Sequence, residues 1–185
     1  PDIAFHRSTE ILGNTMRSEQ VSNALAAEMR HGYFANISYL DAQIGRLLDA
    51  LERSGVAHQT IIVFVSDHGY HLGEHSLWGK TSNFELDARV PCFISVPKSS
   101  QAGQKTNSLA ELVDLFPTLT ELCNLPRPNG LDGISLVPVL QEATHHLKQG
   151  AFTQHPRPAY FDREPDKSPK AMGVSVRTAE ARYTE

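Results

Sequence analysis

The residues best suited to chemistry lie in one short stretch near the middle of the chain. Asp67 and His68 are adjacent there, and the residues that follow include His71, Glu74, His75, Trp78 and Lys80. A solvated connecting loop has no structural need for so many titratable and aromatic groups. An Asp-His pair can bind a metal ion, form an acid/base pair, or cap the next turn through the Asp carboxylate. The density of neighbouring groups favours chemistry over capping.

The elements before this stretch indicate how the pair is positioned. The run from Thr60 to Val65 is β-branched and aromatic, a pattern typical of a buried, parallel central strand covered on both faces. Open α/β sheets place their ligands at the carboxyl ends of such strands. From Ala24 to about Arg53 apolar residues recur three or four apart, which predicts one long amphipathic helix ending at Ser54-Gly55. The sequence therefore predicts an α/β fold with the pair at a sheet edge.

The elements that follow are shorter. Residues 70–89 show no sustained period and are predicted to form a long functional loop. Val90 to Val96 is predicted to be a strand with proline at its start or edge. A helix is expected from about Ala110 to Cys123, with Pro117 either kinking it or starting a new turn.

A domain boundary is expected near residue 145. Residues 1–145 then form the C-terminal portion of a catalytic domain, and residues 146–185 begin a smaller C-terminal subdomain that stays incomplete. In this second part a Pro-rich loop through Lys170 precedes a strand predicted from Met172 to Thr178. The chain opens at Pro1 without Met, and we interpret it as a fragment.

Composition excludes several classes of protein. The net charge is −4 with Lys and Arg scattered singly, so no nucleic-acid partner is predicted. The longest apolar run, Ile61 to Val65, is too short to cross a bilayer, and no membrane association is predicted. The two cysteines, Cys92 and Cys123, lack zinc-site spacing and are too few for a disulfide framework. Both are expected to be buried thiols.

The string from Ser66 to His75 continues with Trp78-Gly79-Lys80 and Asn83-Phe84, and this combination resembles the type I sulfatase family of the alkaline-phosphatase superfamily. Further matching segments stand in family order, among them Tyr33-Phe34-Ala35, Gly45-Arg46-Leu47-Leu48, Val90-Pro91, Asp114-Leu115-Phe116-Pro117-Thr118 and Leu131-Asp132-Gly133. Gln154 to Pro158, followed by Met172 to Thr178, narrows the resemblance towards the iduronate-2-sulfatase branch. A choline-sulfatase-like or other polysaccharide sulfatase stays open.

The resemblance implies an alkaline-phosphatase-like mixed sheet flanked by helices, and hydrolysis of a sulfate ester on a carbohydrate. It implies that Asp67 and His68 are ligands of a Ca²⁺ ion, with the remaining ligands in a family segment that this sequence does not contain. Imidazole is a less typical ligand for calcium than a carboxylate. Lys80 corresponds to the catalytic, sulfate-binding lysine of the family, which neutralises a sulfate oxygen as the S–O bond breaks.

Substrate contacts are expected from four further residues. Tyr70 and His71 are expected to line a sugar-binding rim. Trp78 either stacks on a pyranose face or pins the loop onto the core. Arg157 is expected to pair with a uronate carboxylate, because its guanidinium suits bidentate contact, or else to be structural at the domain joint.

The family's nucleophile is a formylglycine made from the first residue of a C-x-P-x-R motif. Cys123-Asn124-Leu125-Pro126-Arg127 carries Leu where Pro belongs and follows a predicted helix, so it is rejected as that motif. We therefore expect the isolated chain to be inactive and the full-length protein to require a formylglycine-generating enzyme as partner.

Two other functions stay open: a phosphodiesterase or phosphonate hydrolase of the same superfamily, and a non-catalytic pseudo-sulfatase that binds sulfated glycans. The family resemblance implies an exported (periplasmic or extracellular) or lysosomal protein.

Overall fold

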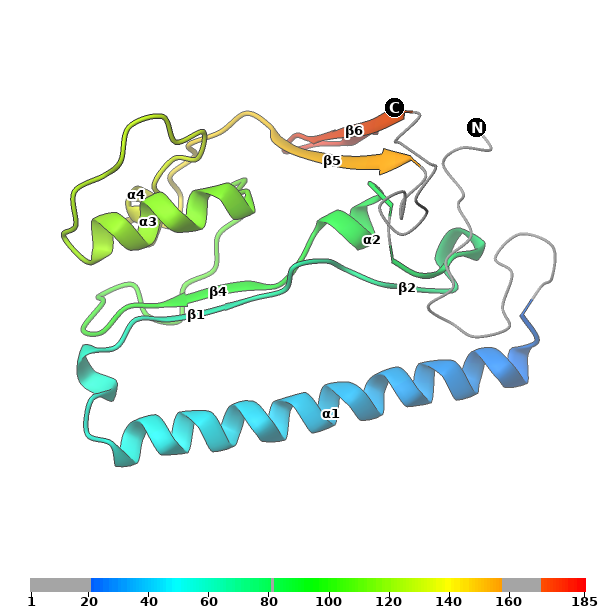
Figure 1. Cartoon of the computed structure of the whole chain (residues 1–185), viewed down its shortest axis with the longest axis horizontal. Coiled ribbons are helices and arrows are strands. Elements are labelled where there is room, and N and C mark those ends of the chain that lie inside the picture. Colours follow the sequence, from blue (N-terminus) through cyan, green and yellow to red (C-terminus); the bar gives the residue numbers. More distant parts are fainter. Residues whose placement is uncertain (1–20, 81, 158–170) are drawn as a thin grey trace, which may run out of the picture.

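The structure is a computed structural model that describes residues 21–80, 82–157 and 171–185. Its helices and strands are, in chain order, α1 (Asn23–Arg53), η2 (Ala57–Gln59), β1 (Ile62–Val65), β2 (His71–Leu72), η3 (Glu74–Ser76), β3 (Trp78–Gly79), α2 (Glu85–Ala88), β4 (Cys92–Ser95), η4 (Leu112–Asp114), α3 (Leu115–Leu122), α4 (Val137–Gln141), β5 (Ala151–Arg157), β6 (Ala171–Arg177) and β7 (Arg182–Thr184). Figure 1 shows β1 and β4 between α1 on one side and α3 on the other.

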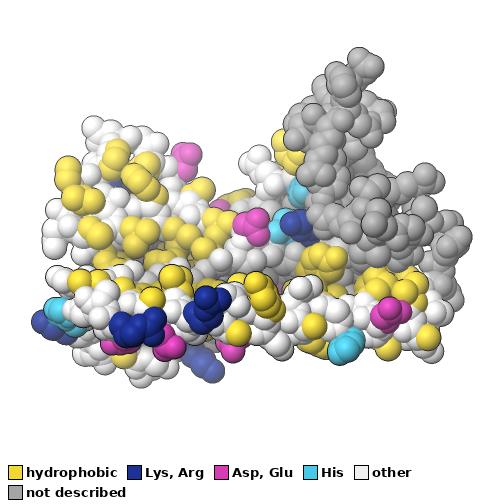
Figure 2. Space-filling view, turned by 60° about the horizontal axis from the view of Figure 1, so that its bottom comes forward, with side chains coloured by type: hydrophobic (Ala, Val, Ile, Leu, Met, Phe, Trp, Pro, Cys, Tyr) yellow, Lys and Arg dark blue, Asp and Glu magenta, His cyan; other side chains and the backbone are white. Residues whose placement is uncertain are grey.

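The long helix α1 is present as predicted. The Ser22 hydroxyl caps its start by accepting a hydrogen bond from the Leu25 N–H at 3.2 Å. The helix ends at Arg53, and Gly55 follows with φ of +73°, a left-handed conformation that glycine adopts without strain. Ala26 is its only fully buried residue among those described, and Figure 2 shows apolar side chains lying openly among the charged ones along this helix.

Strand β1 pairs with β4 in an antiparallel ladder, with Ile62 opposite Ser95 and Val65 opposite Cys92. The predicted parallel pairing of β1 is therefore wrong within the described chain. Between these two strands the described residues form only short elements and no crossover helix. Strand β4 then runs beside β1 in the opposite direction. An apolar run specifies that a segment is a strand, but not the direction of its neighbour.

Burial of this sheet is also less complete than the sequence predicts. Every residue of β1 is at best half-buried, and Phe64 is exposed and lies beside Phe93 of β4. Cys92 and Cys123 are exposed, so their prediction as buried thiols is wrong. Cys92 lies on a strand whose residues are mostly exposed, and Cys123 is the C-cap of α3 at the surface.

Residues 70–89 are more ordered than the predicted loop. β2 and β3 form a small antiparallel hairpin in which His71 pairs with Gly79. One turn of helix, α2, then precedes β4. These elements are too short to produce a sustained period, which is why the sequence pattern did not indicate them.

The helix predicted from Ala110 to Cys123 is present as η4 followed by α3. Pro117 lies in the first turn of α3, where its missing N–H breaks no helical hydrogen bond, so it begins a new helix instead of kinking one. Asp114 is fully buried at this junction and accepts hydrogen bonds from the backbone N–H groups of Glu111 (2.8 Å) and Ile134 (2.9 Å). The Lys148 ammonium also bonds the Asp114 carboxylate, at 2.8 Å.

Strands β5, β6 and β7 form a separate antiparallel sheet that begins at Ala151. It contacts the preceding part of the chain through the Arg182 guanidinium, which donates to the Glu85 carboxylate of α2 at 2.6 Å. The strand predicted from Met172 to Thr178 is confirmed as β6, whereas β7 was not predicted. The boundary near residue 145 stays a prediction. Within the described residues, no helix is long and apolar enough to span a membrane.

We predict that Asp114→Ala lowers the free energy of unfolding by about 3–5 kcal/mol, because two backbone donors lose their buried acceptor and Lys148 keeps only its bond to Glu111. Urea denaturation followed by circular dichroism measures the change. Asp49→Ala is the matched control, since Asp49 is exposed on α1 and should give nearly no change. An Asp114→Ala variant as stable as the control would contradict this role.

Candidate active site

Asp67 lies directly after β1, in a turn that another residue stabilises. The Ser66 hydroxyl donates to the His68 carbonyl at 2.7 Å, and the Ser66 N–H donates to the Pro91 carbonyl at 3.2 Å. The Asp67 side chain is exposed and makes no hydrogen bond or ion pair with the described residues. Since Ser66 already caps the turn, the capping role considered for Asp67 is not needed, and its carboxylate is available to a ligand.

The ring of His68 is oriented by a carbonyl oxygen. Its Nδ1 lies 2.9 Å from the Gly69 carbonyl, which can only accept, so Nδ1 carries the proton. The lone pair of the neutral ring is then on Nε2, the atom left for a metal ion. Asp67 and His68 thus fit a metal site in ligand type. Among the described residues no group of three or more His, Cys, Asp or Glu side chains is close enough to hold a metal, so this pair would be part of a larger ligand set.

Gly69 allows α2 to approach the end of β1. Its N–H donates to the Asp87 carbonyl at 2.7 Å, and a Cβ at this position would lie 1.8 Å from the Leu86 carbonyl oxygen. No side chain fits such a distance. The glycine after the Asp-His pair is therefore required by close packing against α2.

Asp87 is a buried carboxylate, 1% exposed, that joins both sides of the candidate site. Its Oδ1 accepts from Nδ1 of His71 at 3.0 Å and lies 3.8 Å from Nδ1 of His68. Its Oδ2 accepts from the Ser82 N–H at 2.8 Å and from the Ser82 hydroxyl at 2.5 Å. Burial by itself raises the pKa of Asp87, but the bonds from His71 and Ser82 and the charges of both imidazoles when protonated outweigh it, so the pKa lies below its ordinary value.

His71 is 1% exposed, which does not agree with its predicted place on a sugar-binding rim. Its ring lies near the rings of Phe84 and His75, at centroid distances of 6.3 and 6.2 Å. Nε2 of His71 is buried and has no hydrogen-bond partner among the described residues. The burial favours an internal role for His71 through its bond to Asp87.

Tyr70 and Trp78 both face α1. The Tyr70 ring lies 5.2 Å from that of Tyr33, and the Arg30 guanidinium lies 5.3 Å from the centre of the Trp78 ring, a cation–π distance. Trp78 is 5% exposed, and this burial favours the role of pinning the loop over that of stacking on a sugar. Tyr70 is half-buried, and its part in substrate binding stays a prediction.

Lys80 and Arg157 lie on different elements. Lys80 is half-buried and directly follows β3, two residues before Ser82. Arg157 is the last residue of β5, and its side chain lies outside the described part of the structure. His155, two residues earlier on β5, has its ring 6.3 Å from that of His68. The start of the second sheet therefore reaches the Asp-His pair.

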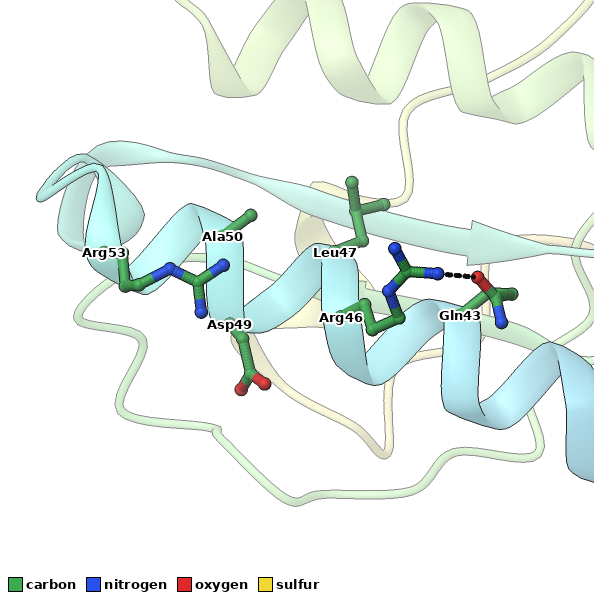
Figure 3. Close-up of a pocket in the computed structure, with 6 residues that line it drawn as sticks. All are labelled: Gln43, Arg46, Leu47, Asp49, Ala50 and Arg53. Carbon is green, nitrogen blue, oxygen red and sulfur yellow. Dashed lines mark hydrogen bonds between the residues drawn. The ribbon is translucent and has the colours of Figure 1, made fainter.

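A hollow on α1 is separate from this site. Figure 3 shows that its lining side chains all come from one helix, with Arg46 donating to Gln43 at 2.8 Å. It includes Asp49 and Arg53 but none of the predicted site residues. A surface made by a single helix does not enclose a ligand, so the end of β1 remains the better candidate.

Sequence reasoning missed the residues that support the pair. Asp87 and His155 contact or approach the histidines through the tertiary structure, Ser82 bonds Asp87, and none of the three stands at a spacing that marks it in the sequence. The one usable signal was Gly69, because a glycine directly after two candidate ligands indicates close approach of another backbone.

Two family models match the chain. The model described as "Sulfatase" matches residues 4–125, and that described as "N-sulphoglucosamine sulphohydrolase, C-terminal" matches residues 73–178. Among curated proteins, iduronate 2-sulfatase of Mus musculus is 34% identical over 99% of this chain and 42% of its own length. The chain thus spans about two fifths of that relative.

Two solved structures have a similar fold. One, determined in complex with its substrate D-glucosamine-2-N,6-O-disulfate, has a TM-score of 0.76 and 28% identity over 90% of this chain and 34% of its own. The other is a phosphonate monoester hydrolase from Silicibacter pomeroyi, with a TM-score of 0.67 and 30% identity over 78% of this chain and 30% of its own. The predicted alkaline-phosphatase-like α/β fold is confirmed.

We predict that Gly69→Ala lowers the free energy of unfolding by about 1–3 kcal/mol, because the added methyl group collides with the backbone of α2. The matched control is Gly45→Ala on α1, where an added Cβ has no atom within 4 Å. Alanine in a helix should leave stability unchanged or raise it by up to about 1 kcal/mol. Equal urea midpoints for the two variants would show that α2 does not pack this closely.

Proposed function

The chain belongs to the sulfatase family, and from that premise we propose that it forms part of a calcium-dependent hydrolase of sulfate esters on carbohydrates. The observation that carries the proposal is the exposed Asp67 carboxylate at the end of β1, in a turn that Ser66 already caps. A carboxylate is a preferred ligand of Ca²⁺, which normally takes roughly six to eight oxygen ligands. The Asp67 carboxylate supplies oxygen ligands of this kind, and the next residue, His68, offers Nε2. When bound, the cation would offset the negative charge of the sulfate group.

Lys80 contributes the second positive charge in this proposal. It follows β3 directly, and Ser82, two residues further on, is fixed to the buried Asp87 by two hydrogen bonds. A lysine in a segment fixed in this way can stabilise the negative charge that develops on a sulfate oxygen. It does not have to reorganise during the reaction. The attacking group is not part of this proposal for the chain, because Cys123 lies at the C-cap of α3 and is rejected as nucleophile.

The proposed substrate is a sulfated carbohydrate of the iduronate-2-sulfate type, in keeping with the curated relative and with the disulfated glucosamine bound by the similar solved structure. Arg157 is the residue proposed to pair with a uronate carboxylate. We further propose that the complete protein is matured by a formylglycine-generating enzyme and is exported or lysosomal.

A second candidate function is hydrolysis of phosphonate monoesters or phosphodiesters, favoured by the similarity to the Silicibacter pomeroyi hydrolase. The two functions differ in the atom that is attacked, sulfur or phosphorus, and in metal preference. Assay of the purified complete protein with matched aryl sulfate and aryl phosphonate monoester substrates, together with metal analysis, separates them. Turnover of the phosphonate alone, with transition metals bound, would favour this second function.

We predict that Asp67→Ala in the complete protein removes bound calcium and nearly all sulfatase activity, because an oxygen ligand at the centre of the site is lost. Metal analysis after gel filtration gives the calcium content, and circular dichroism checks that the fold is retained. Asp49→Ala should keep both calcium and activity. Stoichiometric calcium with normal turnover in Asp67→Ala would end the assignment.

We predict that Lys80→Ala in the complete protein lowers kcat by about 100-fold or more, since a charge facing the developing anion is removed. Lys98→Ala is the control, because Lys98 lies in the turn after β4 and outside the site. Steady-state kinetics with an aryl sulfate measure both. An unchanged kcat/KM in Lys80→Ala would place this lysine outside the active site.

A further inference from the structure

We propose that Asp87 is a positioning residue that orients the calcium ligand His68 and ties it to the segment carrying Lys80. This inference rests on the function proposed above. Asp87 does not touch substrate in the proposal, since it is 1% exposed. It acts through the residues that it binds.

One side of the Asp87 carboxylate faces the histidines. Oδ1 accepts from Nδ1 of His71 at 3.0 Å and lies 3.8 Å from Nδ1 of His68, while the Asp87 carbonyl accepts from the Gly69 N–H at 2.7 Å. Asp87 therefore contacts the segment after β1 through both its side chain and its backbone. Nδ1 of His68 donates to the Gly69 carbonyl, and the negative charge of Asp87, 3.8 Å away, favours the proton on that same atom and increases the electron density that Nε2 offers to a metal ion.

The other side of the carboxylate faces the segment after β3. Oδ2 accepts from both the N–H and the hydroxyl of Ser82, and it is the only carboxylate oxygen to do so among the described residues. Asp87 thus links the segment after β1 to Ser82, in addition to the β2–β3 ladder in which His71 pairs with Gly79 beside Lys80. No Lys or Arg pairs with Asp87 in the described structure, so the donors that stabilise its charge are His71 and the N–H and hydroxyl of Ser82.

Asparagine cannot replace this carboxylate without loss. Its amide has one acceptor oxygen, so the nitrogen must face either Ser82 or His71, and both of those positions present donors. Asp87→Asn therefore keeps the shape of the side chain while breaking one side of the contact. Ser82→Ala removes the hydroxyl bond to Asp87, and the bond that this hydroxyl accepts from the Phe84 N–H, but leaves the Ser82 N–H and the contact with His71 in place.

Calorimetric titration of CaCl₂ into the metal-stripped complete protein tests the proposal, at a temperature where circular dichroism shows every variant to be folded. Asp87→Asn should weaken the calcium Kd by about 10- to 100-fold. Ser82→Ala and the exposed control Asp49→Asn should stay within about threefold of the wild type, because neither changes the charge beside His68. A folded Asp87→Asn protein with the wild-type calcium Kd overturns the proposal.

A second measurement covers the case in which Asp87→Asn does not fold. Nitrogen-15 spectra of the histidine-labelled, metal-free wild type report which ring nitrogen of His68 carries the proton. A proton on Nδ1, with the Nε2 signal shifting when CaCl₂ is added, supports the proposal; a proton on Nε2 overturns it. If the wild type binds no calcium at all, the proposed function fails too, whereas calcium binding that needs Asp67 but not Asp87 contradicts only this inference.

Discussion

The buried carboxylate of Asp87 is the contact on which the geometry of the candidate site depends. An ionised carboxylate inside a protein is stable only when donors surround it, and here His71 and both donors of Ser82 serve that purpose. Because those donors come from separate segments, satisfying one charge fixes the positions of two loops relative to each other. Because the buried Asp87 carboxylate needs these hydrogen-bond donors, it constrains where the Asp-His pair and the segment of Lys80 lie.

Two further charged contacts join the second sheet to the rest of the described chain. The Glu85 carboxylate, two residues before Asp87, accepts from Arg182 of β7 and lies 3.4 Å from Arg177 of β6. These guanidinium groups lower the pKa of Glu85 although burial opposes the change. At the other end of the sheet, Lys148 bonds Asp114 just before β5 begins. The short helix α2 therefore faces the Asp-His pair on one side and the C-terminal sheet on the other, which explains how His155 of β5 comes near His68.

The residues proposed for the chemistry come from different elements. The end of a strand presents Asp67 and His68, whereas Lys80 follows the two-residue strand β3. Trp78 with Arg30 joins that small hairpin to α1. A site assembled in this way needs its supporting contacts as much as its ligands, because a small displacement of either charge weakens the binding of an anion between them.

The sequence by itself determined the local features of this protein. The period of apolar residues defined α1 to within a residue of its bounds, the run before Ser66 defined β1, and the motif from Ser66 to Lys80 identified the family. Only the tertiary structure decided the direction of the neighbour of β1 and the burial of His71 and Asp87. Local pattern reflects the conformation and average environment of a segment, whereas pairing and burial depend on segments distant in sequence. Asp87 and Ser82 look like ordinary polar residues of a short helix and a loop until folding encloses them together.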